Sequence, residues 1–203
     1  MALAYLLGKP SAKLLKVNLN IPLLLVLSII PDIDILLIPQ MHRGPTHSII
    51  TAVLVFIPFF VVYRKKAVPY FIALFSHSLI GDFFVGGQVM LFWPLTRAEF
   101  GLHDLGSYYI NIENPINVAL ELALFLNATV IMFKTRDIYQ FFRNKKTNIV
   151  LIIPIFSVLL PSVVSYPLYV PVLLIPPHLF YLVLFSASVL IVLVGFFKKR
   201  NLG

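Results

Sequence analysis

The chain has no cysteine and one tryptophan among its 203 residues, and only 12% of its residues are charged. The lack of cysteine excludes disulfide bridges and thiolate metal sites. Soluble domains have roughly 45–50% apolar residues and about a quarter charged residues, whereas 60% of this chain is hydrophobic. That composition excludes a soluble cytosolic enzyme, a disordered linker and a coiled coil. The sequence therefore predicts an integral membrane protein.

Long apolar runs predict an all-α fold, a polytopic membrane helical bundle with about six transmembrane helices. We expect one integral membrane domain over residues 1–203, with supporting helices in 115–203. A spanning helix needs about 20 mostly apolar residues. Met1–Asn20 falls short of this and carries three lysines, so we expect an amphipathic segment on the membrane surface. The runs that come near the required length are Ile21–Ile38, Ser48–Tyr63, Ala67–Val85, Pro115–Phe133, Ile149–Ser165 and Pro177–Phe197.

The basic residues fall on one side of a six-span chain. All but two of the 16 lysines and arginines lie in the N-terminal segment, the loops 64–66 and 134–146, and the C-terminal tail. The positive-inside rule makes that side cytoplasmic, with both termini there, and we expect the plasma (inner) membrane. The net charge of +8 then reflects topology, and we expect no nucleic-acid partner.

The remaining polar residues gather on the opposite side. All five histidines and every acidic residue except Asp137 map there. The positive-inside rule does not explain this, because Asp and Glu contribute little to topology. The clustering of acids and histidines therefore indicates a functional site on the non-cytoplasmic side.

Asp32 and Asp34 stand inside an apolar run, Ile-Ile-Pro-Asp-Ile-Asp-Ile-Leu-Leu-Ile. Carboxylates in such a run are expensive and by default mark function. Pro31 is expected to break or kink the helix here, and in an unwound turn both carboxylates could reach one centre. The alternative is a helix end that emerges among the lipid headgroups, but the apolar residues Ile35–Ile38 that follow argue against it.

His42-Arg43-Gly44-Pro45-Thr46-His47-Ser48 reads as a turn leading into the second span. Thr46 is a candidate N-cap of that span, and His47 would then face back toward the first. Imidazole together with carboxylate is a ligand mix for zinc, manganese or iron. Arg43 presents a planar fork of donors suited to a phosphate or carboxylate. The alternative is a pair of interfacial histidines in a short loop.

The third and fourth spans carry further ionisable residues. His77 and Asp82 are five apart, a spacing that does not align on a regular α-helix. Gly81 could allow a local bulge that brings Asp82 round. Glu121 lies near the depth expected for Asp82, where it could be a ligand, a general base or the partner of Arg43. The loop Gly86–Leu95 reads equally well as an interfacial aromatic belt or as a lid over the site.

Taken together, these motifs resemble the YdjM-like family of predicted membrane-bound metal-dependent hydrolases. The resemblance covers about the first half of the chain, residues 1–114, and rests on the order Pro-Asp-x-Asp, His-Arg-Gly-x-Thr-His-Ser, Ser-His…Asp and Leu-Phe-Trp-Pro. It implies a metal site formed by Asp32, Asp34, His42, His47, His77 and Asp82.

The chain departs from the family pattern in three ways. No histidine precedes His42, Ile35 stands where members often have a histidine, and the spacing from His77 to Asp82 is five where four is common. One metal position is thereby altered, so the departures bear on whether one or two ions bind. They also leave open a non-catalytic member of the family.

We therefore expect a membrane-embedded metal-dependent hydrolase with one or two divalent ions, zinc ahead of manganese, at the outer membrane face. A site beside the headgroups suggests a lipid or lipid-linked substrate, with a phosphoester favoured by Arg43. Asp82 or Glu121 would act as base. The alternatives are a metal-ion or proton transporter, and a membrane scaffold with a structural metal site. The oligomeric state cannot be read from the sequence.

Overall fold

The computed structural model describes residues 1–37, 42–86, 88–101, 112–165 and 168–200. Within these ranges the chain is all-helical apart from an isolated antiparallel bridge between Val89 and Phe100. The first half contains α1 (Ala2–Leu14), α2 (Ile21–Leu27), the 3₁₀ turn η1 (Ile30–Ile33), α3 (Asp34–Leu37), the 3₁₀ turn η3 (Pro45–His47), α4 (Ile49–Tyr63), α5 (Val68–Ser76) and the π-helix η5 (His77–Gly86). The second half contains α6 (Pro115–Lys134), η7 (Asp137–Gln140), η8 (Lys146–Leu151), α7 (Ile152–Pro154), η9 (Ile155–Leu159), α8 (Leu160–Val164), η10 (Val172–Leu174) and α9 (Ile175–Arg200).

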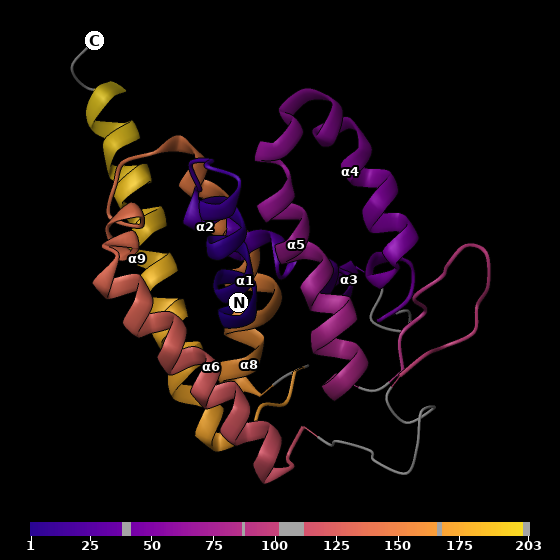
Figure 1. The fold of residues 1–203 in the computed structure, drawn as a ribbon. Coiled ribbons are helices and arrows are strands. Elements are labelled where there is room, and N and C mark those ends of the chain that lie inside the picture. Colours follow the sequence, from indigo (N-terminus) through magenta and orange to yellow (C-terminus); the bar gives the residue numbers. More distant parts are fainter. Residues whose placement is uncertain (38–41, 87, 102–111, 166–167, 201–203) are drawn as a thin grey trace.

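Among the residues that the structure describes, three helical stretches are long and apolar enough to cross a membrane: Pro115–Lys134, Lys146–Val164 and Val172–Lys198, of 20, 19 and 27 residues. They match the three spans predicted in the second half of the chain. The helix α9 packs against α8, and its Phe180 and Tyr181 contact Phe125 of α6 (Figure 1). The six-span count is not confirmed. The helix α4 has 15 residues, and the apolar helix Val68–Phe84 is also shorter than the others.

The first predicted span, Ile21–Ile38, is broken as Pro31 suggests. The helix α2 stops at Leu27, and a 3₁₀ turn with Pro31 in its first turn follows before α3 begins at Asp34. Proline cannot donate the backbone hydrogen bond of a regular helix interior. The break therefore places Asp32 and Asp34 in short irregular turns, where their side chains are not confined to opposite helix faces.

The N-terminal segment forms a helix that packs against other helices of the bundle, and its expected place on the membrane surface stays a prediction. The helix α1 packs against α5 and α6 (Figure 1), and its Tyr5 is fully buried. The reason is a stripe of small residues, Ala4, Gly8 and Ala12, that lets α1 approach its neighbours closely. A Cβ atom at Gly8 would come within 2.8 Å of the side chain of Leu24.

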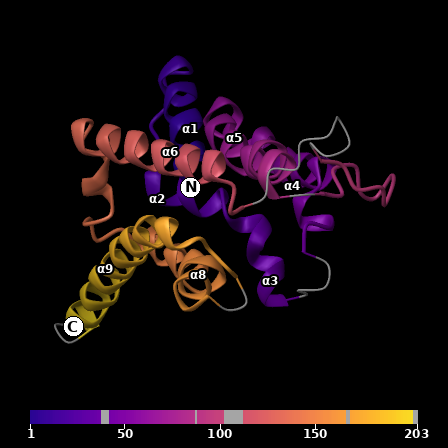
Figure 2. The same ribbon diagram turned by 90° about the horizontal axis from the view of Figure 1, so that it is seen from below.

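The basic segments gather at one end of the bundle. In Figure 1 the turn 64–66, the turns after α6 and the C-terminal end of α9 all lie at the top. The chain begins instead near the middle of the bundle, as Figure 2 also shows from below. The expected placement of both termini on the cytoplasmic side is therefore not confirmed.

Candidate metal centre

Four side chains from three separate segments converge at one point and form what we call the inner cluster. Asp32 comes from η1, His47 from η3, and His77 and Asp82 from η5. His77 Nε2 lies 3.1 Å from Asp32 Oδ1 and 3.3 Å from Asp82 Oδ2. His47 Nε2 lies 3.4 Å from each of the same two oxygens. Two imidazole nitrogens and two carboxylate oxygens thus face a common centre.

A second group, the outer cluster, lies on the other side of His47. It consists of Asp34, His42 and Thr46. Asp34 Oδ1 lies 2.9 Å from His42 Nδ1, and Asp34 Oδ2 accepts a hydrogen bond of 2.6 Å from Thr46 Oγ1. His47 Nδ1 lies 3.3 Å from Asp34 Oδ2. His47 therefore joins the two clusters through its two ring nitrogens.

The inner cluster fits a divalent cation. One ligand atom each from Asp32, His47 and His77 lies within 4.8 Å of the others, and the same holds for Asp34, His42 and His47. Asp82 Oδ2 is buried and makes no hydrogen bond, although it faces both imidazoles. A buried carboxylate oxygen without a donor is costly unless something positive satisfies it. The nitrogen and oxygen donors suit zinc or manganese.

The π-helix explains how His77 and Asp82 reach the same centre. A π-helix hydrogen-bonds from residue i to residue i+5, so side chains five apart lie on one side. The sequence suggested a bulge near Gly81, and the structure confirms it over the whole segment His77–Gly86. The spacing of five, which departs from the family pattern, therefore does not separate the two side chains.

The segment 88–100 fixes the turn that carries His47. Ser48 Oγ lies 2.6 Å from the carbonyl oxygen of Trp93, and Ile49 N donates to the carbonyl oxygen of Leu91. Ser48 also caps α4 by accepting from Ile50 N and Thr51 N. Thr46, which was predicted as the N-cap, bonds Asp34 instead because the helix starts two residues later. The segment 88–100, which we call the bracket segment, thus holds the turn that carries His47 in place.

Arg43 lies beside the inner cluster in a constrained conformation. Its φ of 65° is in the left-handed region, and its carbonyl oxygen accepts from Met90 N. Its Nε lies 3.7 Å from Asp82 Oδ1, yet this nitrogen is buried and makes no hydrogen bond. Arg43 therefore places a buried positive charge beside the centre, in an ion pair with Asp82 and with one N–H that makes no hydrogen bond.

His47 is fully buried between three carboxylates. Burial of the imidazole disfavours its protonation, but hydrogen bonds to Asp32 and Asp34 outweigh this effect and raise the pKa of His47 to about 9. Without a cation, the site therefore holds a proton on this ring. A metal ion would have to displace that proton.

Glu121 does not join either cluster. It is exposed on α6 and makes none of the ion pairs formed by the described residues around Asp32 and Asp34. Its assignment as a base stays a prediction. Sequence reasoning missed the roles of Thr46 and Ser48. Both residues carry a hydroxyl next to the start of α4, and the sequence does not show which hydroxyl caps the helix and which one bonds the distant carboxylate of Asp34.

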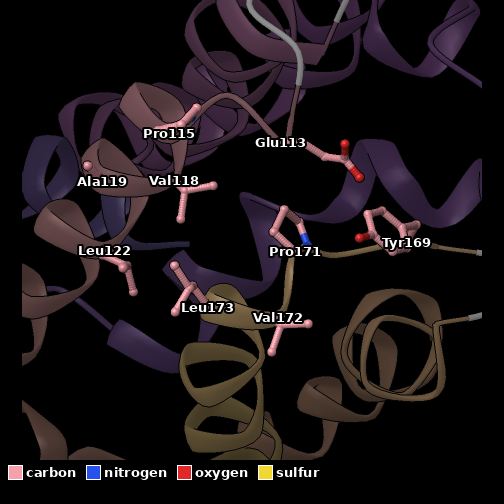
Figure 3. Close-up of a pocket in the computed structure, with 9 residues that line it drawn as sticks. All are labelled: Glu113, Pro115, Val118, Ala119, Leu122, Tyr169, Pro171, Val172 and Leu173. Atoms are coloured by element: carbon pink, nitrogen blue, oxygen red, sulfur yellow. The ribbon is translucent and has the colours of Figure 1, made fainter.

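The second half of the chain forms apolar walls. A cavity of about 410 Å³ lies between the first turns of α6 and the segment 169–173. Figure 3 shows Leu122 on one side of it, and the carboxylate of Glu113 and the ring of Tyr169 on the other. Most of its lining is aliphatic or proline. The supporting role expected for residues 115–203 stays a prediction.

Comparison with models of protein families identifies the family of this chain. The family model described as YdjM inner membrane protein matches residues 1–201, which is nearly the whole sequence. The chain belongs to this family. It is thus an integral inner membrane protein, and the match extends well beyond the motifs of the first half. No curated protein and no solved structure matches the chain.

Proposed function

We propose that the protein is a metal-dependent hydrolase that cleaves a phosphoester of a membrane lipid or lipid-linked molecule. The observation that carries this proposal is the convergence of Asp32, His47, His77 and Asp82 on one buried centre beside Arg43. Such a donor set would hold zinc or manganese. A divalent ion supplies Lewis-acid chemistry there, because it lowers the pKa of water and neutralises charge on a phosphoryl oxygen.

Residues of the chain would act as the general base and would orient the substrate. Asp82 turns one carboxylate oxygen toward the imidazoles and the other toward Arg43. It can therefore bind the ion through Oδ2 and accept a proton from the attacking water at Oδ1. Glu121 on α6 is kept as the alternative base, although its exposed side chain joins neither cluster. Arg43 orients the substrate, since a guanidinium binds phosphate oxygens in a fork geometry.

The depth of the centre supports a lipid substrate. The helix α4 separates His47 from the basic turn 64–66 by 15 residues, which is about 22 Å of helix at 1.5 Å per residue. A hydrocarbon core is about 30 Å thick. If the basic turn lies at the cytoplasmic edge of that core, about 8 Å of the core remain beyond the centre, so the centre is recessed in the far leaflet below its ester and phosphate groups.

The distribution of charge favours a hydrolase over an ion pathway. A relay for protons or metal ions needs ionisable side chains at successive depths. The stretches Ile49–Val62 and Val68–Ser76, which connect the basic end with the site, contain no Asp, Glu, Lys, Arg or His. The polar residues are concentrated at one level, as a reaction centre requires.

The proposal is tested with purified protein loaded with zinc or manganese and vesicles that contain lipid phosphomonoesters or phosphodiesters. We expect release of phosphate or headgroup, loss of at least about 100-fold in rate for His77→Ala, and a smaller loss for Arg43→Ala. Arg97→Ala is the matched control, because Arg97 is an exposed arginine on the neighbouring loop. Wild-type turnover by His77→Ala, or no turnover of any phosphoester by the metal-loaded protein, would overturn the proposal.

A further inference from the structure

His47 separates two groups that each look able to bind a cation. Its Nε2 faces Asp32 and Asp82, and its Nδ1 faces Asp34. A neutral imidazole has one lone pair and one N–H. It can therefore ligate an ion through one nitrogen while it donates through the other, but it cannot ligate two ions unless it loses both protons.

Asp34 is already satisfied by hydrogen bonds. Thr46 Oγ1 donates to Oδ2 at 2.6 Å, His42 Nδ1 lies 2.9 Å from Oδ1, and His47 Nδ1 lies 3.3 Å from Oδ2. Its side chain is only 6% exposed. Asp82 differs, because its buried Oδ2 has no hydrogen-bond donor. The two carboxylates thus suit different roles. Asp34 accepts hydrogen bonds from its neighbours, whereas Asp82 has an oxygen that can bind a cation.

The net charge of the two clusters and Arg43 also favours a single divalent ion. Asp32, Asp34 and Asp82 carry three negative charges, and Arg43 beside them carries one positive charge. One divalent ion brings this group to neutrality when the histidines are neutral. A second divalent ion would leave a surplus of about two positive charges in a buried site, which is strongly unfavourable.

We propose that the centre holds one ion, bound by the inner cluster, and that Asp34 is a positioning residue for His47 and not a ligand. His47 Nδ1 lies 3.0 Å from Thr46 Oγ1 and 3.3 Å from Asp34 Oδ2. Asp34, together with the Thr46 hydroxyl that donates to it, thus receives the Nδ1 proton of His47, which selects the tautomer whose Nε2 can bind the ion. Thr46 and His42 in turn hold the Asp34 carboxylate in place. Carboxylates that support a metal-bound histidine in this way are a recurrent device. This inference rests on the proposed metal centre.

The supporting residues should matter in a graded order. Asp34 touches His47 directly, whereas His42 acts on Asp34 and its own side chain is 27% exposed. Loss of His42 leaves Thr46 still bonded to Asp34. We therefore expect Asp34 substitutions to weaken the metal site more than His42→Gln does.

The test is a titration of the purified, metal-free protein with Co²⁺, followed by its visible absorption and by metal analysis after removal of unbound ion. We expect one equivalent in the wild type. Asp34→Asn should still bind one equivalent with a similar absorption spectrum, but with a Kd about 10–100-fold higher. His77→Ala and Asp32→Ala should lose the spectrum. Glu99→Gln, which changes an exposed carboxylate in the bracket segment, is the matched control.

Several outcomes overturn the inference. Two equivalents in the wild type and one in Asp34→Asn would make Asp34 a ligand of a second ion. A changed absorption spectrum in Asp34→Asn would make it a ligand of the first. An unchanged Kd with a lowered Tm would reduce Asp34 to a structural role. All these readouts concern binding, so they stand even if no phosphoester is hydrolysed.

Discussion

The side chains of His77 and Asp82 meet at 3.3 Å although they are five residues apart in one helix. In a regular α-helix this spacing would turn them away from each other, since neighbours lie three or four apart. The π-helical segment His77–Gly86 restores the alignment. Pi-helical turns often occur at functional sites, and here the turn completes the inner cluster.

This relationship predicts the effect of changing the spacing. Deletion of Ile80, whose side chain is partly exposed, would place the aspartate four positions after the histidine. Side chains at this spacing align on an α-helix. We expect metal affinity within about tenfold of wild type. Insertion of one alanine after Gly81 gives a spacing of six and should abolish binding. Equal loss in both variants, measured by Co²⁺ titration, would contradict the role of the π-helix.

A second prediction concerns Ser48, which caps α4 and holds the bracket segment. Ser48→Ala removes the cap and the bond to the carbonyl oxygen of Trp93. We expect a loss of about 1–3 kcal/mol in the free energy of unfolding, seen as a lower Tm in detergent. Thr51→Val is the control, because Thr51 Oγ1 is buried without a partner and its removal should cost nothing. An equal Tm in the two variants would contradict this reading.

The third prediction concerns the anchor of the N-terminal helix. Tyr5 donates to Asp137 Oδ2 at 2.7 Å, Thr135 donates to the same oxygen at 2.8 Å, and Lys9 pairs with it. Asp137→Ala removes the shared acceptor of these three groups, although Tyr5 and Thr135 still contact each other at 3.3 Å and Thr135 still donates to the carbonyl oxygen of Ile131; it should lower the free energy of unfolding by about 1–3 kcal/mol. Lys9→Met removes one partly exposed partner and should cost less than about 1 kcal/mol. The reverse order of the two melting temperatures would show that α1 is not held through Asp137.

Much of the metal centre could be predicted from the sequence. Asp32, His47, His77 and Asp82 stand in apolar surroundings where ionisable groups require partners, and the structure brings all four together. The division between ligands and supporting residues could not be predicted. It depends on which nitrogen of His47 faces which carboxylate, and residue types and spacings do not contain that information.

The fold was less predictable in the first half of the chain. Three lysines made Met1–Asn20 look like a surface segment, whereas its small residues pack α1 into the bundle. A hydropathy window also cannot distinguish a spanning helix from α4, which stops after 15 residues. The apolar runs of the second half were predicted correctly because each is long and contains at most one charged residue, Glu121 in the first of them.

A last prediction follows from the proton that the ion-free site holds on His47. The pKa of this imidazole is raised to about 9, whereas a free histidine titrates near 6.5. Below pH 9 a metal ion must therefore displace a proton to reach Nε2, and its affinity should rise with pH. We expect the Kd for Zn²⁺ to fall about tenfold per pH unit between pH 6 and 8 and to level off near pH 9.

Proton release upon binding provides an independent measure of the same competition. About one proton or more per ion should appear in a weakly buffered solution with an indicator dye at pH 7. Arg97→Ala should give the wild-type value, because this exposed side chain lies outside both clusters. A Kd that does not change from pH 6 to 8, with no proton released, would mean that His47 is already neutral in the ion-free protein. The carboxylates would then not dominate its environment, and the place of His47 between Asp32 and Asp34 would need another explanation.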